Sequence, residues 1–190
     1  MRKVALRDQL VTVRSRRSLL ESTEAARAIA GHLLAAEEVR RAASVAAYVG
    51  IGHEPLTGPL LDGLLASGTR VILPVLLPDN DLDWAAYDGP AALVPAARGL
   101  LEPLGPRLGV DAVGTPDVVL TPGLAVDRTG MRLGRGGGSY DRALGRVPVG
   151  TFVCTLLFDG ELLDIVPSDP HDRPVTAVVT PSGITRLGRG

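Results

Sequence analysis

This sequence has one cysteine, almost no net charge and no long apolar run, and each of these features excludes a class of protein. The one cysteine, Cys154, cannot form an internal disulfide, and its apolar neighbours (VGTFVCTLLF) indicate a buried structural thiol instead of a nucleophile. With a net charge of −1, the chain has no general field to attract nucleic acid or anionic lipid. No apolar run reaches the length of a membrane span, and MRKVALRDQL lacks the apolar core of a signal peptide. We therefore expect a cytoplasmic monomer whose partners are small molecules, with no nucleic-acid partner and no membrane contact.

Lysine is almost absent too. Of the 20 basic residues, Lys3 is the only lysine, and all the others are arginines. A lysine ammonium is a compact point charge, whereas an arginine guanidinium is a wide planar fork. Lys3 is therefore a candidate for a site where arginine would not serve, although chance near a chain terminus explains it equally well on composition alone.

The pattern of apolar residues predicts an α/β fold in a single domain over residues 1–190. The second expected helix has Ser22-Thr23-Glu24 as its predicted cap. Helices are expected where apolar residues recur at helical spacing, over residues 3–19, 22–38, 56–67 and 140–144. Strands are expected in short apolar runs, over residues 44–49, 70–73, 83–87, 117–121, 149–154 and 177–180.

The order of these elements predicts the architecture. Strand 44–49, helix 56–67 and strand 70–73 form a β-α-β unit, which is typical of a parallel sheet covered by helices. Pro74 is expected to end the strand before it, and the Gly- and Pro-rich segment 89–116 is expected to be mostly loop. We predict an open, mostly parallel sheet flanked by helices, Rossmann-like and similar to the sugar-phosphate-isomerase and CoA-transferase folds. Ligands of such sheets usually bind beyond the carboxyl ends of the strands.

Residues 132–141, RLGRGGGSYD, contain four glycines. The segment is not a Walker A loop, because no Lys-Ser/Thr pair follows its glycines, and its Gly-x-Gly-x-x-Ser pattern lacks the third glycine of a dinucleotide fingerprint. Residues 136–138 would nevertheless let backbone N–H groups face a phosphate without clashes from Cβ atoms, and the neighbouring arginines add positive charge. The segment is therefore either a phosphate-binding loop or a flexible surface loop.

Two aspartates are candidate metal ligands. Asp141 follows the glycine-rich segment directly, where its carboxylate would repel a bound phosphate unless a cation lay between them. Mg²⁺ typically takes one or two carboxylates together with phosphate oxygens, and Asp172, in PSDPHDRPV, could supply the second carboxylate. The structural alternatives are a first-turn aspartate that complements a helix dipole and a turn aspartate in a proline-rich loop.

Together these segments resemble the 5-formyltetrahydrofolate cyclo-ligases, also called methenyltetrahydrofolate synthetases. Lys3-x-x-Leu6-Arg7 looks like the family's N-terminal K-x-x-L-R. Residues 122–142, PGLAVDRTGMRLGRGGGSYDR, resemble its long signature P-G-x-A-F-D-x-x-G-x-R-L-G-x-G-x-G-Y-Y-D-R. The other segments that fit the family, in the right order, are residues 48–54, Trp84, Glu102-Pro103, residues 167–172 and the closing VVTPSG.

The resemblance implies an ATP-dependent ring closure. Such enzymes convert 5-formyltetrahydrofolate and ATP to 5,10-methenyltetrahydrofolate, ADP and phosphate. The formyl oxygen attacks the γ-phosphate, N10 then adds to the activated carbon, and phosphate leaves. A formamide oxygen is a poor leaving group until it is phosphorylated, and catalysis of phosphoryl transfer consists mostly of positioning and charge neutralisation.

The resemblance also implies which residues form the site. Lys3 and Arg7, four residues apart on one helix face, would contact the ATP phosphates. Glu54 would accept hydrogen bonds from the pterin ring, and Val49 would flank the folate. Asp141 and Asp172 would hold Mg²⁺. The complete ATP-binding set that the resemblance implies is Lys3, Val4, Ala5, Leu6, Arg7, Arg132, Leu133, Gly134, Arg135, Gly136, Gly137, Gly138, Ser139 and Tyr140.

The chain departs from the family pattern at two positions. Ser139 stands where the family has the first tyrosine of Tyr-Tyr-Asp, and Val126 stands where it prefers phenylalanine. Two other hypotheses remain open at this level. A nucleotide- or folate-binding regulatory module would bind ATP or folate without turnover, and a sugar-phosphate isomerase relative would need a general base near the phosphate loop but no ATP.

Overall fold

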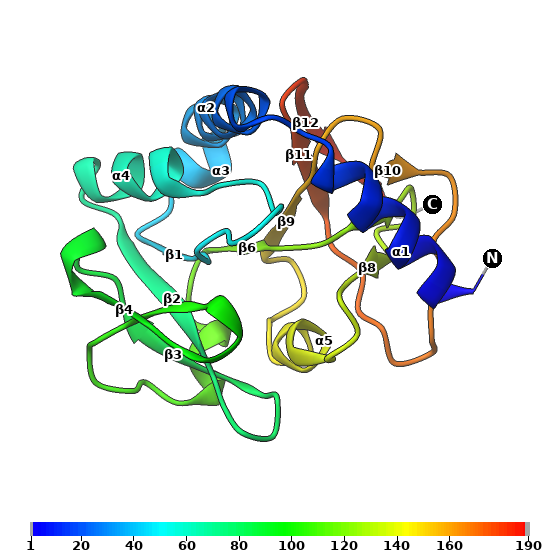
Figure 1. Cartoon of the computed structure of the whole chain (residues 1–190). Helices are drawn as coiled ribbons and strands as arrows, with labels where there is room; N and C mark the ends of the chain where they lie inside the picture. The colour runs from blue at the N-terminus through cyan, green and yellow to red at the C-terminus, as the bar shows by residue number, and fades with distance from the viewer. Residues whose placement is uncertain (1, 189–190) are drawn as a thin grey trace.

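The computed structural model describes residues 2–188, which form an α/β fold around a seven-stranded sheet (Figure 1). The strands of this sheet are β1 (Ser44–Ala46), β2 (Arg70–Leu76), β3 (Leu82–Ala86), β6 (Val118–Thr121), β9 (Phe152–Leu156), β11 (Ala177–Thr180) and β12 (Gly183–Arg186). Their order across the sheet is β12-β11-β9-β6-β1-β2-β3. The edge strands β3 and β12 are antiparallel to their neighbours, and the strands between them are parallel. The predicted open, mostly parallel sheet is confirmed.

The order of the parallel strands reverses at β1. The chain runs from β1 outward to β2, returns to β6 on the other side of β1, and continues to β9 and β11. Counted along the chain, the parallel strands therefore have the doubly wound order 2-1-3-4-5, whose ligand crevice lies beyond the carboxyl ends of the first and third strands. Tyr48 follows β1 and Pro122 follows β6, so both residues lie at this crevice.

Helices cover both faces of the sheet. On one face lie α2 (Leu19–Ala35), α3 (Glu37–Arg40) and α4 (Gly58–Ala66), above the sheet in Figure 1, and α5 (Ser139–Leu144) lies on the other. Consecutive strand residues alternate between these layers: Val45 and Ala47 pack with α2 and α4, whereas Ala46 packs with the layer of α5. Cys154 is fully buried in the first layer, and burial raises the pKa of its thiol, as expected for a structural cysteine. Within residues 2–188, no helix is both long enough and apolar enough to cross a bilayer.

The first helix, α1 (Lys3–Ser15), covers a separate small sheet. This sheet has the order β10-β7-β8, formed by β7 (Ala125–Asp127), β8 (Arg132–Leu133) and β10 (Leu162–Leu163). Leu6 and Leu10 form the buried apolar face of α1, and they pack on Leu124, Leu133 and Val166. The outer face of α1 is exposed, so this contact is narrow.

A buried ion pair holds the carboxyl end of α1. The Arg14 side chain is 3% exposed, and its guanidinium donates hydrogen bonds to both carboxylate oxygens of Glu161, at 2.8 and 2.7 Å. The same guanidinium donates a hydrogen bond of 2.7 Å to the carbonyl oxygen of Gly123. Arg14 thus ties α1 to the residues that precede β7 and β10.

Three local predictions were wrong. β2 does not end at Pro74 but continues to Leu76, because β1 pairs only with Arg70–Ile72 and the missing N–H of Pro74 faces no strand on that side. The cap of α2 is Ser18, not the segment 22–24, because Ser18 and Glu21 form a reciprocal capping box. The short strands β7, β8, β10 and β12 were not predicted.

The segment expected to be loop contains a hairpin. It includes β4 (Leu93–Pro95), β5 (Leu101–Pro103) and the 3₁₀ turns η1 (Pro90–Ala92), η2 (Ala97–Gly99) and η3 (Val110–Gly114). The hairpin is joined to the main sheet by the Glu102 carboxylate, which accepts a hydrogen bond of 3.0 Å from the backbone N–H of Leu76. This bond ties β5 to the last residue of β2.

Candidate active site

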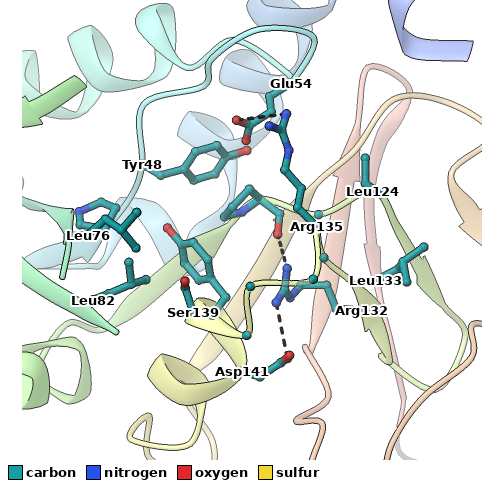
Figure 2. A pocket seen from close by; sticks show the side chains of 18 of the residues that line it. Tyr48, Glu54, Leu76, Leu82, Leu124, Arg132, Leu133, Arg135, Ser139 and Asp141 are labelled. Carbon is teal, nitrogen blue, oxygen red and sulfur yellow. Dashed lines mark hydrogen bonds and ion pairs between the residues drawn. The ribbon is translucent and has the colours of Figure 1, made fainter. Parts of the chain in front are cut away.

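A pocket of about 550 Å³ opens at the carboxyl ends of β1 and β6, where the strand order reverses. Figure 2 shows Glu54 and Arg135 at one end of this pocket and Arg132 with Asp141 at the other. Its walls come from segments far apart in the sequence, namely α1, the loop after β1, strands β2 and β3, the β4–β5 hairpin, the segment 132–141 and the loop 169–172. The predicted glycine loop and the predicted acidic residues therefore share one pocket.

The loop after β1 bends sharply and carries Glu54 into the pocket. Thr57 fixes the bend, because its hydroxyl accepts a hydrogen bond from Gly50 N–H at 3.0 Å and donates one to the Tyr48 carbonyl at 2.8 Å. A side chain at residue 50 would not fit, since a Cβ there would lie 2.3 Å from the carbonyl oxygen of Pro55. Local packing thus determines the position of Glu54.

Glu54 is a largely buried acid with one basic neighbour. Its side chain is 11% exposed, and its carboxylate lies 3.7 Å from the guanidinium of Arg135. Burial raises the pKa of Glu54, and the positive charge of Arg135 opposes that rise. Arg135 therefore favours the ionised carboxylate, which is the form that accepts hydrogen bonds.

Two buried tyrosine hydroxyls line the same pocket. Neither Tyr48 nor Tyr140 has a hydrogen-bond partner for its hydroxyl among the described residues. Burial raises the pKa of both phenols, and the nearby charge of Glu54 raises it further, so both remain protonated. Buried hydroxyls are nearly always hydrogen-bonded in folded proteins, so these two are available to a ligand.

The glycine loop, residues 134–138, connects β8 to α5 and is joined to α1. The guanidinium Nε of Arg7 donates a hydrogen bond of 2.8 Å to the carbonyl oxygen of Gly134. Gly136 and Gly138 have φ angles of 106° and 73°, a conformation that favours glycine, and a Cβ on Gly136 would lie 3.4 Å from the Arg7 guanidinium. The path of the loop therefore favours glycine at residues 136 and 138, and the loop lies against the Arg7 guanidinium.

Lys3 faces the pocket from the first turn of α1. Its Nζ lies 2.6 Å from Asp169 Oδ2 and 3.2 Å from Asp172 Oδ2. The hydrogen bond to Asp169 is the main cause that raises the pKa of Lys3, so the ammonium stays charged. Lys3 and Gly137, 134 positions apart by number, line the same pocket.

A buried arginine forms part of the pocket wall near Asp141. Arg132 Nη1 donates a hydrogen bond of 2.9 Å to the Pro122 carbonyl, and Nη2 lies 3.5 Å from Asp141 Oδ1. Burial lowers the pKa of Arg132, and the charge of Asp141 opposes that change. The guanidinium carbon also lies 5.6 Å from the centre of the Tyr140 ring. Arg132 is thus held on several sides, whereas Arg135 is mostly exposed.

The two predicted metal ligands line the pocket in different groups. Asp172 lies with Asp169 and His171, and these three offer ligand atoms within 4.8 Å of one another; among the described residues, Asp141 is not part of that group. Burial acts to raise the pKa of Asp172, but hydrogen bonds from Asp169 N–H and Lys3 outweigh it and lower the pKa below its usual value. Asp172 is therefore ionised, as a metal ligand must be.

Not every residue of the predicted ATP-binding set reaches the pocket. Val4 and Ala5 are exposed on α1, and Leu6 is buried between α1 and the small sheet. The members that line the pocket are Lys3, Arg7, Arg132, Leu133, Gly134, Arg135, Gly136, Gly137, Gly138, Ser139 and Tyr140, together with Val49 and Glu54 from the predicted substrate set.

Sequence reasoning missed several residues of the pocket. Arg14 carried no signal among the many arginines, and Tyr48 stood inside an expected strand. Asp169 could have been found from its spacing, three residues before Asp172 in the same loop. The apolar residues of the wall, Pro74, Leu76, Leu82, Leu100 and Leu101, come from strands and a hairpin whose pairing the sequence does not show.

The fold and the pocket define a doubly wound α/β protein whose ligand crevice is lined by basic side chains and glycines. The sequence profile described as the 5-formyltetrahydrofolate cyclo-ligase family matches residues 1–181. The chain belongs to this family, as the resemblance of its motifs predicted, and it is an enzyme of the ligase class.

Individual relatives agree with this assignment. The chain is 47% identical over 150 residues to the 5-formyltetrahydrofolate cyclo-ligase of Mycolicibacterium smegmatis. This alignment covers 76% of this chain and 77% of the relative. It is 33% identical over 183 residues to the 5-formyltetrahydrofolate cyclo-ligase of Escherichia coli, covering 90% of this chain and 98% of the relative. Both alignments extend over most of the two chains compared.

Solved structures show the same fold. The 5,10-methenyltetrahydrofolate synthetase of Aquifex aeolicus superimposes with a TM-score of 0.85 at 29% identity, over 100% of this chain and 95% of that one. A 5,10-methenyltetrahydrofolate synthetase from Mycoplasma pneumoniae gives a TM-score of 0.76 at 20% identity, over 95% of this chain and 99% of that one. The seven-stranded sheet and its helices are therefore the fold of this family.

Proposed function

We propose that the chain catalyses the ATP-dependent conversion of 5-formyltetrahydrofolate to 5,10-methenyltetrahydrofolate, with release of ADP and phosphate. One observation carries this proposal beyond the family assignment. A single pocket joins a set of cations and glycine backbone, suited to phosphates, to an acid flanked by two tyrosine hydroxyls, suited to a ring rich in N–H groups. The reaction needs these two kinds of site side by side.

The ATP phosphates would bind between α1 and the glycine loop. Lys3 and Arg7 lie on one side of this part of the pocket, and the backbone of residues 134–138 lies on the other. Backbone N–H groups without neighbouring Cβ atoms approach phosphate oxygens closely, and the two side chains add positive charge. When ATP binds, Lys3 would exchange its carboxylate partners for phosphate oxygens.

The pterin ring would bind beside Glu54. An ionised carboxylate accepts hydrogen bonds from the ring amino and N–H groups, and Arg135 favours the ionised form. The hydroxyls of Tyr48 and Tyr140 would donate to acceptor atoms of the same ligand. The loop locked by Thr57 holds this acid in place before substrate arrives, which reduces the cost of ordering it.

The chemistry would proceed in two steps within this pocket. The formyl oxygen attacks the γ-phosphorus, and the bond between that phosphorus and the β-phosphate oxygen breaks. ADP is released, and the folate becomes an N5-iminium phosphate. N10 then adds to the activated carbon and loses its proton, and the carbon–oxygen bond breaks with phosphate as the leaving group. The residues of the pocket contribute by aligning the two substrates and neutralising the transferred phosphoryl group.

Mg²⁺ fits the donor set near the phosphate end. Asp172 and Asp141 line the pocket and offer carboxylate oxygens, which Mg²⁺ prefers, and Asp169 lies next to Asp172. We propose that Asp172 and Asp141 would hold Mg²⁺ in this part of the pocket. The bound ion would neutralise charge on the phosphates.

The proposed activity is tested by an absorbance assay. Purified protein mixed with Mg²⁺, ATP and 5-formyltetrahydrofolate is expected to produce the conjugated methenyl product, which absorbs in the near ultraviolet. Parallel reactions without ATP, and with a chelator in place of Mg²⁺, should give no rise in absorbance. If a folded sample binds ATP or folate by calorimetry but forms no product, the proposed reaction is wrong.

Replacing Glu54 by glutamine is expected to weaken folate binding and to stabilise the fold. The neutral amide presents an N–H₂ donor where the carboxylate accepts, so KM for 5-formyltetrahydrofolate should rise about tenfold or more, with KM for ATP unchanged. The pKa of Glu54 is higher in the folded protein than in the unfolded chain. The protonated carboxyl of Glu54 therefore contributes its full stability below the unfolded-state pKa, and the wild type loses this stability as pH rises through the folded-state pKa. The variant escapes that loss, and its free energy of unfolding at pH 8 should exceed that of the wild type.

Urea unfolding at pH 4 and pH 8 separates the two effects. The stability advantage of Glu54→Gln over the wild type should be present at pH 8 and small at pH 4. Asp62→Asn is a matched control, because Asp62 is an exposed carboxylate of α4 outside the pocket. Equal KM values for the wild type and Glu54→Gln would remove Glu54 from the substrate site.

A further inference from the structure

The tip of the β4–β5 hairpin places a strained arginine at the pocket. Arg98 has φ 60° and ψ 28°, a left-handed conformation that residues with a Cβ seldom adopt. Gly99 follows with φ 72°, so two consecutive residues take this form. Such conformations persist where the surrounding structure imposes them, and they cluster at ligand sites. Arg98 and the next residues of the tip, Leu100 and Leu101, line the pocket.

Arg98 differs from the other lysine and arginine side chains that line the pocket. Each of those has a protein partner: Asp169 and Asp172 for Lys3, Gly134 for Arg7, Glu161 for Arg14, Pro122 and Asp141 for Arg132, and Glu54 for Arg135. Arg98 is exposed and makes no hydrogen bond or ion pair within residues 2–188. Its charge is therefore the one most available to a ligand among the basic side chains of the described pocket.

The surroundings of Arg98 are unlike the phosphate end of the pocket. The hairpin is joined to β2 through the bond between Glu102 and Leu76, on the side of the sheet away from α1. Figure 2 shows Leu76 and Leu82 on the side of the pocket opposite Leu124 and Leu133. Leu76, Leu82, Leu100 and Leu101 thus give an apolar wall to the pocket that Arg98 and Glu54 also line.

The folate substrate has the same sequence of chemical groups. Its pterin ring is followed by an apolar aminobenzoyl ring, and the molecule ends in a glutamate with two carboxylates. If the pterin lies at Glu54 and the aminobenzoyl ring lies on the leucine wall, the glutamate emerges where the hairpin tip stands. A guanidinium is well suited to this end, because it binds a carboxylate through two parallel hydrogen bonds.

We propose that Arg98 binds the glutamate carboxylate of the folate substrate and thereby selects folates that carry a charged tail. This inference rests on the proposed function and adds to it a residue for substrate selection outside the reacting centre. A glycine would adopt the left-handed backbone conformation at residue 98 without strain, but it would not supply the charge that Arg98 brings to the pocket.

The strain provides an informative variant. Arg98→Gly removes the guanidinium and accepts the positive φ without cost, so the fold should be retained or slightly stabilised. Its KM for 5-formyltetrahydrofolate is expected to rise about five- to tenfold, because an exposed charge-assisted contact is lost. KM for ATP and kcat should not change. Arg98→Lys keeps a charge but not the planar fork and should fall between the two.

A substrate analogue makes the test specific for the carboxylate. In this analogue a neutral methyl amide replaces the glutamate of 5-formyltetrahydrofolate. Relative to wild type with the natural substrate, the affinity of the wild type for the analogue and the affinity of Arg98→Gly for the natural substrate should fall by about the same factor. Arg98→Gly should bind the two compounds with equal affinity. Arg128→Gln, an exposed arginine outside the pocket, is the matched control and should behave as the wild type.

Each result decides the proposal. An equal loss with both substrates, or no loss with either, would overturn it. A rise in KM for ATP instead would show that Arg98 contacts phosphate and not the folate tail. If the wild type forms no product, the proposed function fails, and calorimetric binding of the two folates to the wild type and Arg98→Gly still answers whether Arg98 recognises the carboxylate.

Discussion

Replacing Lys3 by methionine is expected to raise KM for ATP about 30-fold while leaving the fold intact, because a charge-assisted hydrogen bond to phosphate is lost. Lys3 lies in the first turn of α1, and its ammonium donates hydrogen bonds to Asp169 and Asp172. Its aliphatic stem is replaced closely by methionine, so packing changes little. Initial rates of methenyl formation at varied ATP, with far-ultraviolet circular dichroism as a check of folding, measure the effect.

Two further variants give this prediction a sharp control. Lys3→Arg restores the charge with a wider group, and it should recover only part of the affinity if the compact ammonium is what the site needs. Arg16→Met removes an exposed charge from the end of the same helix, outside the pocket, and should leave KM for ATP unchanged. An unaltered KM in Lys3→Met would mean that the lone lysine is an accident of composition.

Replacing Glu161 by glutamine is expected to lower the free energy of unfolding by about 3 kcal/mol, because it leaves the buried charge of Arg14 without its counterion. Both side chains are almost fully buried, and Glu161 also accepts a hydrogen bond from the Phe158 N–H. Urea unfolding measures the loss. Since α1 carries Lys3 and Arg7, KM for ATP should rise as well, and hydrogen exchange of the α1 amides should become faster.

The double variant Arg14→Met, Glu161→Met tests whether the pair acts as a unit. Replacing both partners by apolar residues removes the unpaired charge, so this variant should be more stable than either single variant. Hydrogen exchange of the α1 amides should be slower in the double variant than in either single variant, because the packing of α1 is recovered. If the two single effects simply add, Arg14 and Glu161 are not coupled, and the anchoring of α1 depends on its leucines alone.

The elements of the fold that the sequence predicted well were those that local pattern determines. The short apolar runs at residues 44–49 and 117–121 correspond to β1 and β6, the two strands that frame the site. Pro74 misled the prediction, because the cost of a proline in a strand depends on whether a neighbouring strand needs its N–H, and pairing is a long-range property. The strand order that creates the crevice is likewise invisible in the chain itself.

The sequence predicted the residues of the candidate site whose type is rare in this chain, and it did not reveal those whose type is common. Glycines in a cluster and a single lysine stand out in any sequence, and the structure brings both to one pocket. Arg14, by contrast, is one arginine among many, and only its burial against Glu161 distinguishes it. The strain at Arg98 is a property of backbone angles, which no side-chain pattern records.

The contact of Lys3 with Asp169 and Asp172 joins the start of the described chain to a loop near its end. A nucleotide bound between α1 and the glycine loop, as proposed above, would therefore connect segments from the two ends of the chain. Saturating substrate stabilises the entire fold in proportion to the logarithm of its concentration. When ATP or folate is scarce, a larger fraction of the enzyme would be unfolded and open to degradation, and its abundance would fall with the supply of its substrates.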